Sequence, residues 1–419
     1  MEKLKIAILH YSAPPVVGGV ESVIQAHARL LREMDYPTTV IAGSGSNNAL
    51  PFGTEFIQIP ELDSNNPLIA QISQELEQGH IPGNFDDTVT SLEHDLASVL
   101  SHLDLIMVHN VFTKHFNLPL TAALCHLLDK GVLPRCFAWC HDFTWTSPHS
   151  RSKVYPGYPW DLLRTYRSDV TYVTVSRSRQ LELAGLFGCP SNQIRVIYNG
   201  IYPDELLGIS GEVMELIDRL GLWDSDLNLL MPVRVTQAKN IELAIRVVAE
   251  LKKQGVRPKL VVTGPPDPHD QGSIDYYQGL RSLRDQMDVR KEMRFVYESG
   301  PKPDEPFILD MSMAGSLFRL SDLLFMPSHR EGFGMPILEA GLTGMPIFCA
   351  NNIPAAIEIG GEDVIMFSDD ADPGEVAGLI LNWAKNDPVH KLRRRARQNY
   401  TWQSIFRREI LPLLEGRAL

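Results

Sequence analysis

The sequence predicts an α/β protein in which two doubly wound parallel sheets face a central crevice. Three observations lead to this fold class. The chain has 419 residues, which exceeds one typical hydrophobic core. Short β-branched runs alternate with amphipathic stretches, as in repeated βαβ units. The alternation restarts after about residue 205, so we expect one domain over 1–205 and a second over 206–400, with 401–419 packing back on the first.

The expected strands follow one another in each half, and most are followed by helical periodicity. In the first half they are KIAILHY (5–11), TTVIAG (38–43), LIMVHN (105–110), CFAWCH (136–141) and VTYVTVS (170–176). In the second half they are LNLLMPV (227–233), KLVVTG (259–264), MRFVYE (293–298), DLLFMPS (322–328) and MPIFCAN (345–351). The region from 61 to 101 is acidic and helix-rich, and we interpret it as an elaboration of the first half.

Composition excludes several classes of protein. Hydrophobic residues make up 44% and charged residues 21%, as in globular proteins, and the net charge of −12 argues against a general nucleic-acid binder. No apolar run reaches the ~18 residues of a membrane span, and a peripheral membrane contact has no support. MEKLKIAILHYSAPP indicates a first strand, not a signal peptide. Five cysteines without a paired framework favour free thiols and a cytoplasmic location. The oligomeric state stays open.

Loops at the carboxyl ends of parallel strands are the expected place for a ligand. Gly18 and Gly19 follow the first strand and open a helix, where bare N–H groups suit an anion, although such a pair also makes a tight turn. His109 and His141 each end a strand, and the alternatives for them are capping or core roles and functional ones. GSGS at 43–46 follows the second strand and fails the dinucleotide pattern G-x-G-x-x-G.

The segment after His141, SPHSRSKVYPGYPWDLLRTYR, is rich in cations and aromatic rings within an acidic protein. One interpretation is an acceptor pocket in which Arg151, Lys153 and Arg164 bind an anion and the rings bind sugar faces. The other is a solvated loop with ion pairs and aromatic packing.

The second half carries two loops of interest. Arg234 and Lys239 connect a strand to a helix, where they could neutralise a diphosphate or be ordinary surface charges. In SHREGFGMPILEAGLTGMPI, Glu331 precedes a glycine-rich turn and Glu339 lies in the helix that follows. The turn suits phosphate, and each acid is placed to bind a separate polyol.

The last segment resembles the E-x7-E motif of retaining GT-B glycosyltransferases of family 4. Further matches are GGVE at 18–21, the histidine of CHD, VIYNGI at 196–201 and R-x4-K at 234–239. The resemblance implies the GT-B fold, two Rossmann-like domains around a crevice. It departs from the family pattern before Arg234, where the usual glycine is missing, which leaves the shape of that loop open.

The resemblance implies a role for each matching residue. The N-terminal domain would bind the acceptor and the C-terminal domain the nucleotide sugar. Catalytic residues would be His141, Glu331, Arg234 and Lys239. Donor-binding residues would be Gly18, Gly19, Tyr297, Glu298, Gly332, Phe333, Gly334, Met335 and Glu339, with Tyr297 and Glu298 at the base. Acceptor-binding residues would be His109, Arg151, Lys153 and Arg164.

The implied reaction is retaining transfer of a hexosyl group from a nucleotide-diphosphate sugar to a hydroxyl of a small acceptor. Four nearby cations, with Arg167 the fourth, favour an anionic acceptor such as a phosphorylated sugar or a glycerate derivative. No DxD-type site appears, so no metal is required and metal dependence stays open. Alternatives are a lipid-linked or polysaccharide acceptor, a sugar-nucleotide epimerase of GT-B architecture, and a non-catalytic sugar-nucleotide-binding protein. The donor base, the hexose, the acceptor and the linkage are not predicted.

Overall fold

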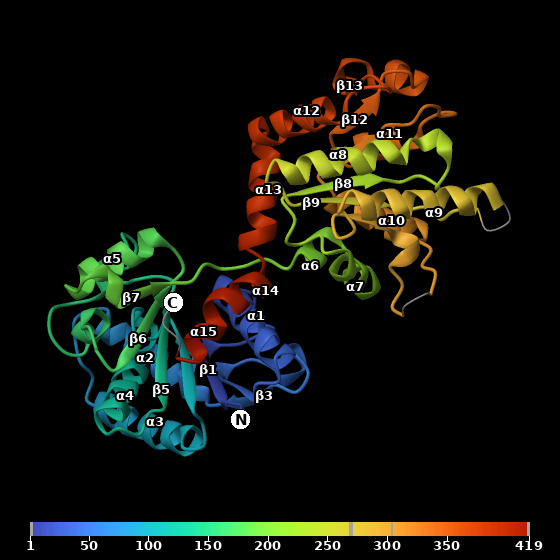
Figure 1. The fold of residues 1–419 in the computed structure, drawn as a ribbon. Helices are drawn as coiled ribbons and strands as arrows, with labels where there is room; N and C mark the ends of the chain where they lie inside the picture. The colour runs from blue at the N-terminus through green and yellow to red at the C-terminus, as the bar shows by residue number, and fades with distance from the viewer. Residues whose placement is uncertain (1–2, 268–270, 303–304, 417–419) are drawn as a thin grey trace. The chain divides into compact units, whose positions relative to one another are not determined.

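The computed structural model describes residues 3–267, 271–302 and 305–416. The chain forms two compact units (Figure 1). Unit 1 comprises Met1–Gly200 and Trp402–Leu419, and unit 2 comprises Ile201–Thr401. The chain therefore passes between the units twice, at 200–201 and at 401–402. Each unit is built on a parallel sheet, as the sequence predicts.

The sheet of unit 1 has the order β3-β2-β1-β4-β5-β6-β7, and all its pairs are parallel. Its strands are β1 Ile6–Ser12, β2 Thr38–Ser44, β3 Glu55–Gln58, β4 Leu105–His109, β5 Arg135–Cys140, β6 Val170–Thr174 and β7 Ile194–Val196. The chain order reverses between β1 and β4. Loops that follow these two strands flank the switch point, which is where doubly wound sheets bind ligands.

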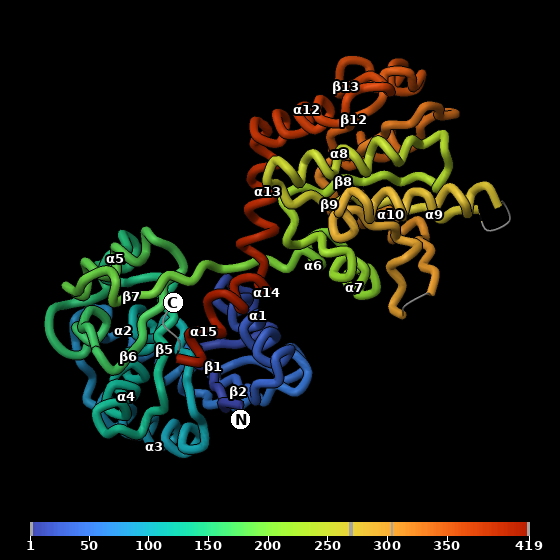
Figure 2. The backbone as a smooth tube through the Cα atoms, viewed as in Figure 1, coloured from blue at the N-terminus to red at the C-terminus, as the bar shows by residue number. Residues whose placement is uncertain are grey.

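Helices cover the sheet of unit 1. They are α1 Gly19–Glu33, α2 Pro67–Leu76, α3 Phe85–Leu100, α4 Leu118–Asp129 and α5 Arg177–Phe187. The C-terminal turns α14 Trp402–Ile405 and α15 Leu411–Leu414 belong to this unit, and α14 lies beside α1 (Figure 2). Trp402 is buried there, with its ring edge-on to that of His27 at a centroid distance of 5.5 Å.

The sheet of unit 2 has the order β10-β9-β8-β11-β12-β13, again with parallel pairs. Its strands are β8 Leu227–Met231, β9 Pro258–Val262, β10 Met293–Phe295, β11 Leu323–Met326, β12 Ile347–Ala350 and β13 Ile365–Phe367. Here the chain order reverses between β8 and β11. Unit 2 thus repeats the doubly wound plan, and its switch point lies between the two strands whose loops the sequence singles out.

The helices of unit 2 alternate with its strands. They are α6 Pro203–Leu207, α7 Gly211–Leu220, α8 Ile241–Lys253, α9 Gln271–Gln286, α10 Met311–Leu320, α11 Met335–Leu342, α12 Pro373–Asn386 and α13 Pro388–Asn399. The central strands of both sheets are buried along their length, because helices cover both faces. Their near-continuous apolar runs reflect this burial.

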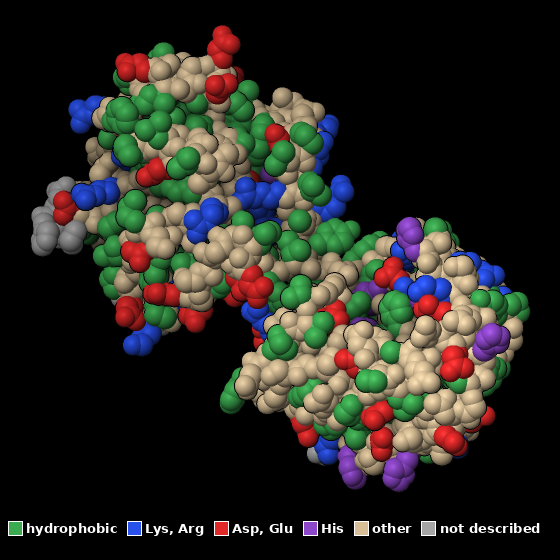
Figure 3. All heavy atoms as spheres, turned by 180° about the vertical axis from the view of Figure 1, so that it is seen from behind, with side chains coloured by type: hydrophobic (Ala, Val, Ile, Leu, Met, Phe, Trp, Pro, Cys, Tyr) green, Lys and Arg blue, Asp and Glu red, His purple; other side chains and the backbone are tan. Residues whose placement is uncertain are grey.

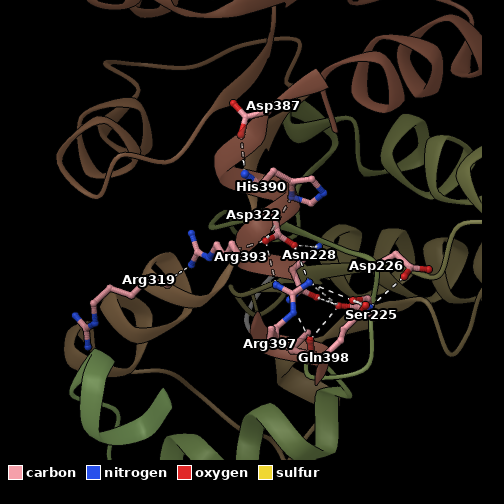
Figure 4. Close-up of polar contacts among 11 residues, drawn as sticks. Ser225, Asp226, Asn228, Arg319, Asp322, Asp387, His390, Arg393, Arg397 and Gln398 are labelled. Carbon is pink, nitrogen blue, oxygen red and sulfur yellow. Dashed lines mark hydrogen bonds and ion pairs between the residues drawn. The ribbon is translucent and has the colours of Figure 1, made fainter. Parts of the chain in front are cut away.

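Asp322 fastens α13 to the amino end of the sheet in unit 2 (Figure 4). Its carboxylate accepts from Arg397 Nη1 at 3.0 Å and Nη2 at 3.1 Å, and from the backbone N–H of Asn228 at 2.8 Å. Burial alone would raise the pKa of Asp322, but Arg397 and these bonds outweigh it and lower the pKa to about 2. The buried carboxylate is therefore ionised and joins α13 to β8 and β11.

Charges of both signs are interspersed on the visible face of each unit (Figure 3). No helix in the described part of the chain is long and apolar enough to cross a membrane. The five cysteines are free thiols, and all but Cys189 are buried.

Candidate active site

Two loops of unit 2 leave neighbouring parallel strands at the same edge of the sheet. One runs from β8 through Arg234 and the 3₁₀ turn η7 (Gln237–Lys239) into α8. The other runs from β11 through Ser328 and Glu331 into α11. Because β8 pairs directly with β11, the two loops emerge side by side. This topology brings together residues that lie far apart in the sequence.

An ion pair joins the two loops. Lys239 Nζ lies 2.7 Å from Glu331 Oε2, and the two side chains are only 19% and 9% exposed. The hydroxyl of Ser328, which is fully buried, donates to Glu331 Oε1 at 2.7 Å. The backbone N–H of His329 donates to Ala238 O at 2.9 Å and holds the loops in register. Both oxygens of Glu331 are therefore engaged, and its charge is balanced by the lysine.

The backbone around Arg234 is closely packed. A Cβ on Gly264 would lie 2.5 Å from Val233 O and 2.7 Å from Arg234 Cα, so glycine is required behind this loop. Asn240 has φ 48° and caps α8 by accepting from the N–H of Leu243. Arg234 itself is exposed, and its guanidinium makes no hydrogen bond or ion pair within the described residues. Among the described residues it is thus a cation without a protein partner, in the loop that also carries Lys239.

The glycine-rich turn leads directly into α11. Gly334 is the N-cap with φ +84°, and a Cβ there would lie 2.9 Å from Ala355 Cβ. Gly332 is exposed, and Phe333 and Met335 stand 56% and 54% exposed. Backbone N–H groups and the positive end of the helix dipole at this terminus favour an anion. Glu339 lies within α11 and is half-buried.

Glu298 belongs to the turn η8 (Val296–Glu298) that follows β10, and its carboxylate is heavily bonded. Arg284 Nη1 donates to it at 2.7 Å, the hydroxyl of Tyr277 at 2.7 Å, and Arg281 Nε lies at 3.0 Å. Burial alone would raise the pKa of Glu298, but these bonds lower it. Tyr297 beside it is half-buried. Glu298 is therefore ionised and holds α9 against the β10 segment. Its contact with the donor base stays a prediction.

In unit 1, Gly18 is the N-cap of α1. A Cβ on Gly18 would lie 2.1 Å from Glu21 Oε2, because Glu21 folds back over it and accepts from Ser12 Oγ at 2.6 Å. Gly19, the first residue of the helix, has open space where a Cβ would stand. The GGVE sequence thus forms a helix start in which the glutamate fixes the loop, a contact that the motif alone does not predict.

His109 and His141 lie against each other. Their rings stack at a centroid distance of 5.4 Å, and His109 Nδ1 is 3.2 Å from His141 Nε2. His109 is fully buried, with its carbonyl 2.9 Å from His10 Nδ1, whereas His141 is 8% exposed. Burial, together with the nearby His10, lowers the pKa of His141 to about 4. His141 is therefore a neutral ring at neutral pH and is oriented by His109.

Sequence reasoning missed several residues of this cluster. Asn110 has φ 61°, and its side-chain oxygen accepts from the N–H of His141 at 2.8 Å. Behind the histidine pair lie Trp139 and His27, whose rings are 4.6 Å apart. Burial lowers the pKa of His27 to about 3. Only the position of Asn110 immediately after His109 could have drawn attention to it, since the other contacts are between distant elements.

The basic segment after β5 makes contacts inside unit 1. The guanidinium groups of Arg151 and Arg164 lie 4.4 Å and 4.0 Å from the ring centroid of Trp145. Lys153 Nζ is 2.9 Å from Glu77, and Arg167 pairs with Asp129 and Asp169. The ion pairs and aromatic packing of the second sequence interpretation are thus present. Whether these cations also bind an acceptor stays a prediction.

Lys114, which the sequence interpretation overlooked, lies near Lys153. It is half-buried, with its Nζ 4.7 Å from the ring centroid of Phe116 and no ion pair among the described residues. Burial lowers the pKa of Lys114, Asp142 opposes this, and Arg179 and Lys153 lower it further. Lys114 follows β4, and the nearby Lys153 and Arg179 are each paired with a carboxylate.

Comparison with known proteins identifies the family. A family model described as glycosyl transferases group 1 matches residues 215–401, and one described as glycosyltransferase family 4 matches residues 17–205. Between them the models cover nearly the whole chain. The chain belongs to the group 1 glycosyl transferases. Its two doubly wound units are the α/β architecture called GT-B, as the sequence predicts.

Curated relatives of this glycosyltransferase are distant. Mannosylglucosylglycerate synthase of Petrotoga mobilis is 23% identical over 363 residues, which are 82% of this chain and 81% of that protein. A D-inositol 3-phosphate glycosyltransferase of Acidothermus cellulolyticus is 26% identical over 215 residues, or 50% of this chain and 44% of that protein.

Among solved structures, sucrose-phosphate synthase of Thermosynechococcus elongatus matches with 15% identity and a TM-score of 0.39, covering 99% of each chain. Anabaena HepE in complex with UDP matches with 18% identity and a TM-score of 0.35, covering 99% of this chain and 100% of that one. In this glycosyltransferase, no group of three or more His, Cys, Asp or Glu side chains within the described residues is placed to hold a metal ion.

Proposed function

We propose that this glycosyltransferase transfers a hexosyl group from a nucleotide-diphosphate sugar, with retention of configuration, to a hydroxyl of a small anionic acceptor. The observation that carries the proposal is the Lys239–Glu331 ion pair, which assembles two predicted donor residues at the switch point of unit 2. In this proposal residues 206–400 bind the donor. Residues 1–205, with 401–419, bind the acceptor.

The donor roles follow from the chemistry of each group. Arg234 has no protein partner within the described residues, and Lys239 lies next to it in the same loop, so both suit a diphosphate. The N–H groups from Gly332 to Met335 add donors at a helix terminus. Glu331 would accept from hexose hydroxyls and Glu339 from ribose hydroxyls. Tyr297 and Glu298 would lie beside the base. Their segment, FVYESG, is the one that resembles the family pattern least closely.

The proposed reaction needs no carboxylate nucleophile. The bond between the anomeric carbon and the phosphate oxygen breaks, the acceptor oxygen bonds to the same face of that carbon, and the acceptor proton passes to the leaving phosphate. Cations stabilise the leaving diphosphate. Both oxygens of Glu331 are held by Lys239 and Ser328, which suits hydrogen bonding to substrate better than nucleophilic attack. His141, neutral because burial lowers its pKa, is proposed to contact the transferred sugar.

An anionic acceptor is favoured by two observations. Lys114, which makes no ion pair among the described residues, lies near Lys153 and Arg179 in unit 1 of a protein with a net charge of −12. Lys153 and Arg179 each have a carboxylate partner. The names of the two curated relatives contain glycerate and inositol 3-phosphate, which are both anionic. We therefore propose a phosphorylated sugar or a glycerate-type acceptor.

A donor and acceptor screen tests this function. UDP-, GDP- and ADP-sugars are supplied with glucose 6-phosphate or glycerate, and with glucose or glycerol as neutral counterparts, while nucleotide release is measured. We expect release that depends on an anionic acceptor, and ¹H NMR of the product should show the anomeric configuration of the donor. Inversion would refute retention. Equal use of the neutral compounds would refute the anionic acceptor. Turnover of the donor without any acceptor would favour an epimerase or hydrolase.

A further inference from the structure

A basic cavity lies in unit 2, along the edge strand β10. Its volume is about 420 Å³, which is within the range of small-ligand sites. Arginines and tyrosines of α9 and of the β10 segment make up most of its lining: Tyr277, Arg281, Arg284, Arg290, Arg294 and Tyr297. The other lining residues are Glu298, Glu305 and Pro306. None of them belongs to the loops that follow β8 and β11. Because β10 ends the sheet, no further strand covers this side among the described residues.

Two of the four arginines have a carboxylate partner. Arg284 is 2% exposed and donates to Glu298 Oε2 at 2.7 Å, while Arg281 Nε lies 3.0 Å from Glu298 Oε1. The hydroxyl of Tyr277 donates to the same carboxylate at 2.7 Å. Glu298 is thus bound by three side chains on the cavity wall, and no bond from it to the other two arginines is present.

Arg290 and Arg294 make no hydrogen bond or ion pair with any residue that the structure describes. Arg290 is exposed and Arg294 is half-buried. Burial lowers the pKa of Arg294, with Glu298 opposing and Arg284 and Arg290 adding to the effect. A guanidinium stays protonated in proteins, so the half-buried Arg294 is a charge without an ion pair among the described residues. The carboxylates of Glu298 and Glu305 also line the cavity.

These features describe an anion site. Two free guanidinium groups repel each other, and an anion between them removes that repulsion. Arginine forks match phosphate oxygens in a bidentate geometry. One phosphoryl group does not fill a cavity of about 420 Å³, and the tyrosine rings offer surface for an organic part.

We propose that this cavity binds a small phosphorylated molecule through Arg290 and Arg294, at a site separate from the donor loops. The proposal does not rest on the transfer reaction, because it is tested without donor and through Arg290 and Arg294. Neither arginine has a predicted part in acceptor binding, although the sugar phosphate used in the test is also a proposed acceptor. The cavity shares Tyr297 and Glu298 with the predicted contact to the donor base, whereas Arg290 and Arg294 have no part in that contact.

Isothermal titration with glucose 6-phosphate at constant ionic strength tests the proposal, with glucose as the uncharged control. We expect wild-type protein to bind glucose 6-phosphate and not glucose, and Arg290→Gln/Arg294→Gln to bind it about tenfold or more weakly. Arg246→Gln removes the same charge from the exposed face of α8 and should bind as wild type. Arg234→Gln, in the donor loop, should also leave this binding unchanged.

The contrary results are equally clear. Absence of binding to wild-type protein at millimolar glucose 6-phosphate overturns the proposal, as does unchanged binding by Arg290→Gln/Arg294→Gln. Loss of binding in Arg234→Gln alone would place the anion at the donor loops instead. The single variant Arg290→Gln alters only an exposed side chain, so it should stay folded, as circular dichroism will show, and should bind more weakly than wild type. Wild-type binding by this variant contradicts the role of Arg290.

Discussion

Lys239 and Glu331 form an ion pair, although each is predicted to bind a different part of the donor. Lys239 is predicted to bind the diphosphate and Glu331 the hexose hydroxyls. Without donor, the lysine is neutralised by the acid at 2.7 Å, and the acid is held by the buried hydroxyl of Ser328. A bound diphosphate would share the lysine, and sugar hydroxyls would donate to the acid. The pair therefore works as one unit, and the effects of removing its members should not add.

We predict that Lys239→Ala and Glu331→Gln each lower kcat/KM by about 10²-fold or more, because each removes a contact that stabilises the transition state. The double variant should be little worse than either single one. Lys253→Ala, which removes an exposed lysine paired with Glu250, is the matched control and should stay near wild type. Nucleotide release measures all four. Near-wild-type rates in folded Lys239→Ala or Glu331→Gln would remove this site assignment.

A second prediction at this scale concerns the acceptor. Arg151→Ala and Lys153→Ala should raise the KM for an anionic acceptor several-fold and leave the KM for the nucleotide sugar nearly unchanged. Lys130→Ala, which removes an exposed lysine paired with Glu93, is the structural comparison and should leave the KM for the acceptor unchanged. Steady-state kinetics with varied acceptor decides the matter. If Arg151→Ala and Lys153→Ala leave the KM unchanged, their role is confined to packing and ion pairing.

Among the secondary-structure elements, the sequence predicts those strands that have a recognisable local pattern of residues. The central strands are apolar and β-branched, so they could be predicted from composition and turns. The edge strands β3, β7 and β13 were not predicted as strands. β3, for example, has the sequence EFIQ and is exposed or half-buried throughout, so it lacks the apolar run of a central strand. Edge pairing depends on a neighbouring strand, which a local pattern does not show.

The candidate site was predictable to the same extent. The loops that carry Arg234, Lys239 and Glu331 are recognisable because each follows a strand, and Glu339 lies in the helix after the second loop. The direct contact between Lys239 and Glu331 was not predictable, because it depends on the pairing of β8 with β11. Ser328 and Asn110 were missed for the same reason. Their hydrogen bonds to Glu331 and His141 depend on how the loops fold, which the residue types alone do not show.

The anchoring of α13 gives a stability prediction. Asp322→Asn leaves Arg397 as a buried, unpaired charge, which should lower the free energy of unfolding by about 3–5 kcal/mol. The exposed Asp224→Asn should change it by less than about 0.5 kcal/mol. Urea denaturation followed by circular dichroism measures both. Equal stability of Asp322→Asn and wild type would show that α13 is held mainly by apolar contacts.

The same carboxylate predicts a pH dependence. The folded chain holds the pKa of Asp322 at about 2, below its ordinary value. Its contribution to stability is therefore complete above the ordinary value and is lost as the pH falls toward 2. Wild-type protein should lose more stability over this range than Asp322→Asn, which has no carboxylate to protonate there. Parallel pH profiles of the two proteins would contradict the assignment.

For the whole molecule, the position of the C-terminal segment is the feature for which the sequence provides the least direct evidence. The chain from Trp402 onward returns to unit 1, where Trp402 packs against His27 and the chain around Gly200. A Cβ on Gly200 would lie 2.7 Å from Trp402 N and 2.8 Å from its Cα, and backbone atoms cannot rotate away. Gly200 in VIYNGI is thus explained by this close approach.

We predict that Gly200→Ala destabilises the protein by about 1–3 kcal/mol, because it forces the C-terminal segment away from unit 1. Gly185→Ala, on the exposed face of α5 with open space where its Cβ would stand, should instead be neutral or stabilising by about 0.5–1 kcal/mol. Thermal or urea unfolding distinguishes them. Equal stability of the two variants would mean that the C-terminal segment adapts without cost.

The central claim is that the switch point of unit 2 binds a nucleotide-diphosphate sugar for transfer. The most direct measurement is acceptor-dependent nucleotide release over a panel of UDP-, GDP- and ADP-sugars, run in parallel with wild-type protein and Lys239→Ala. We predict that one donor class supports release with wild type and that the rate falls about 10²-fold or more in the variant. Turnover that is equally fast in folded Lys239→Ala would contradict the account.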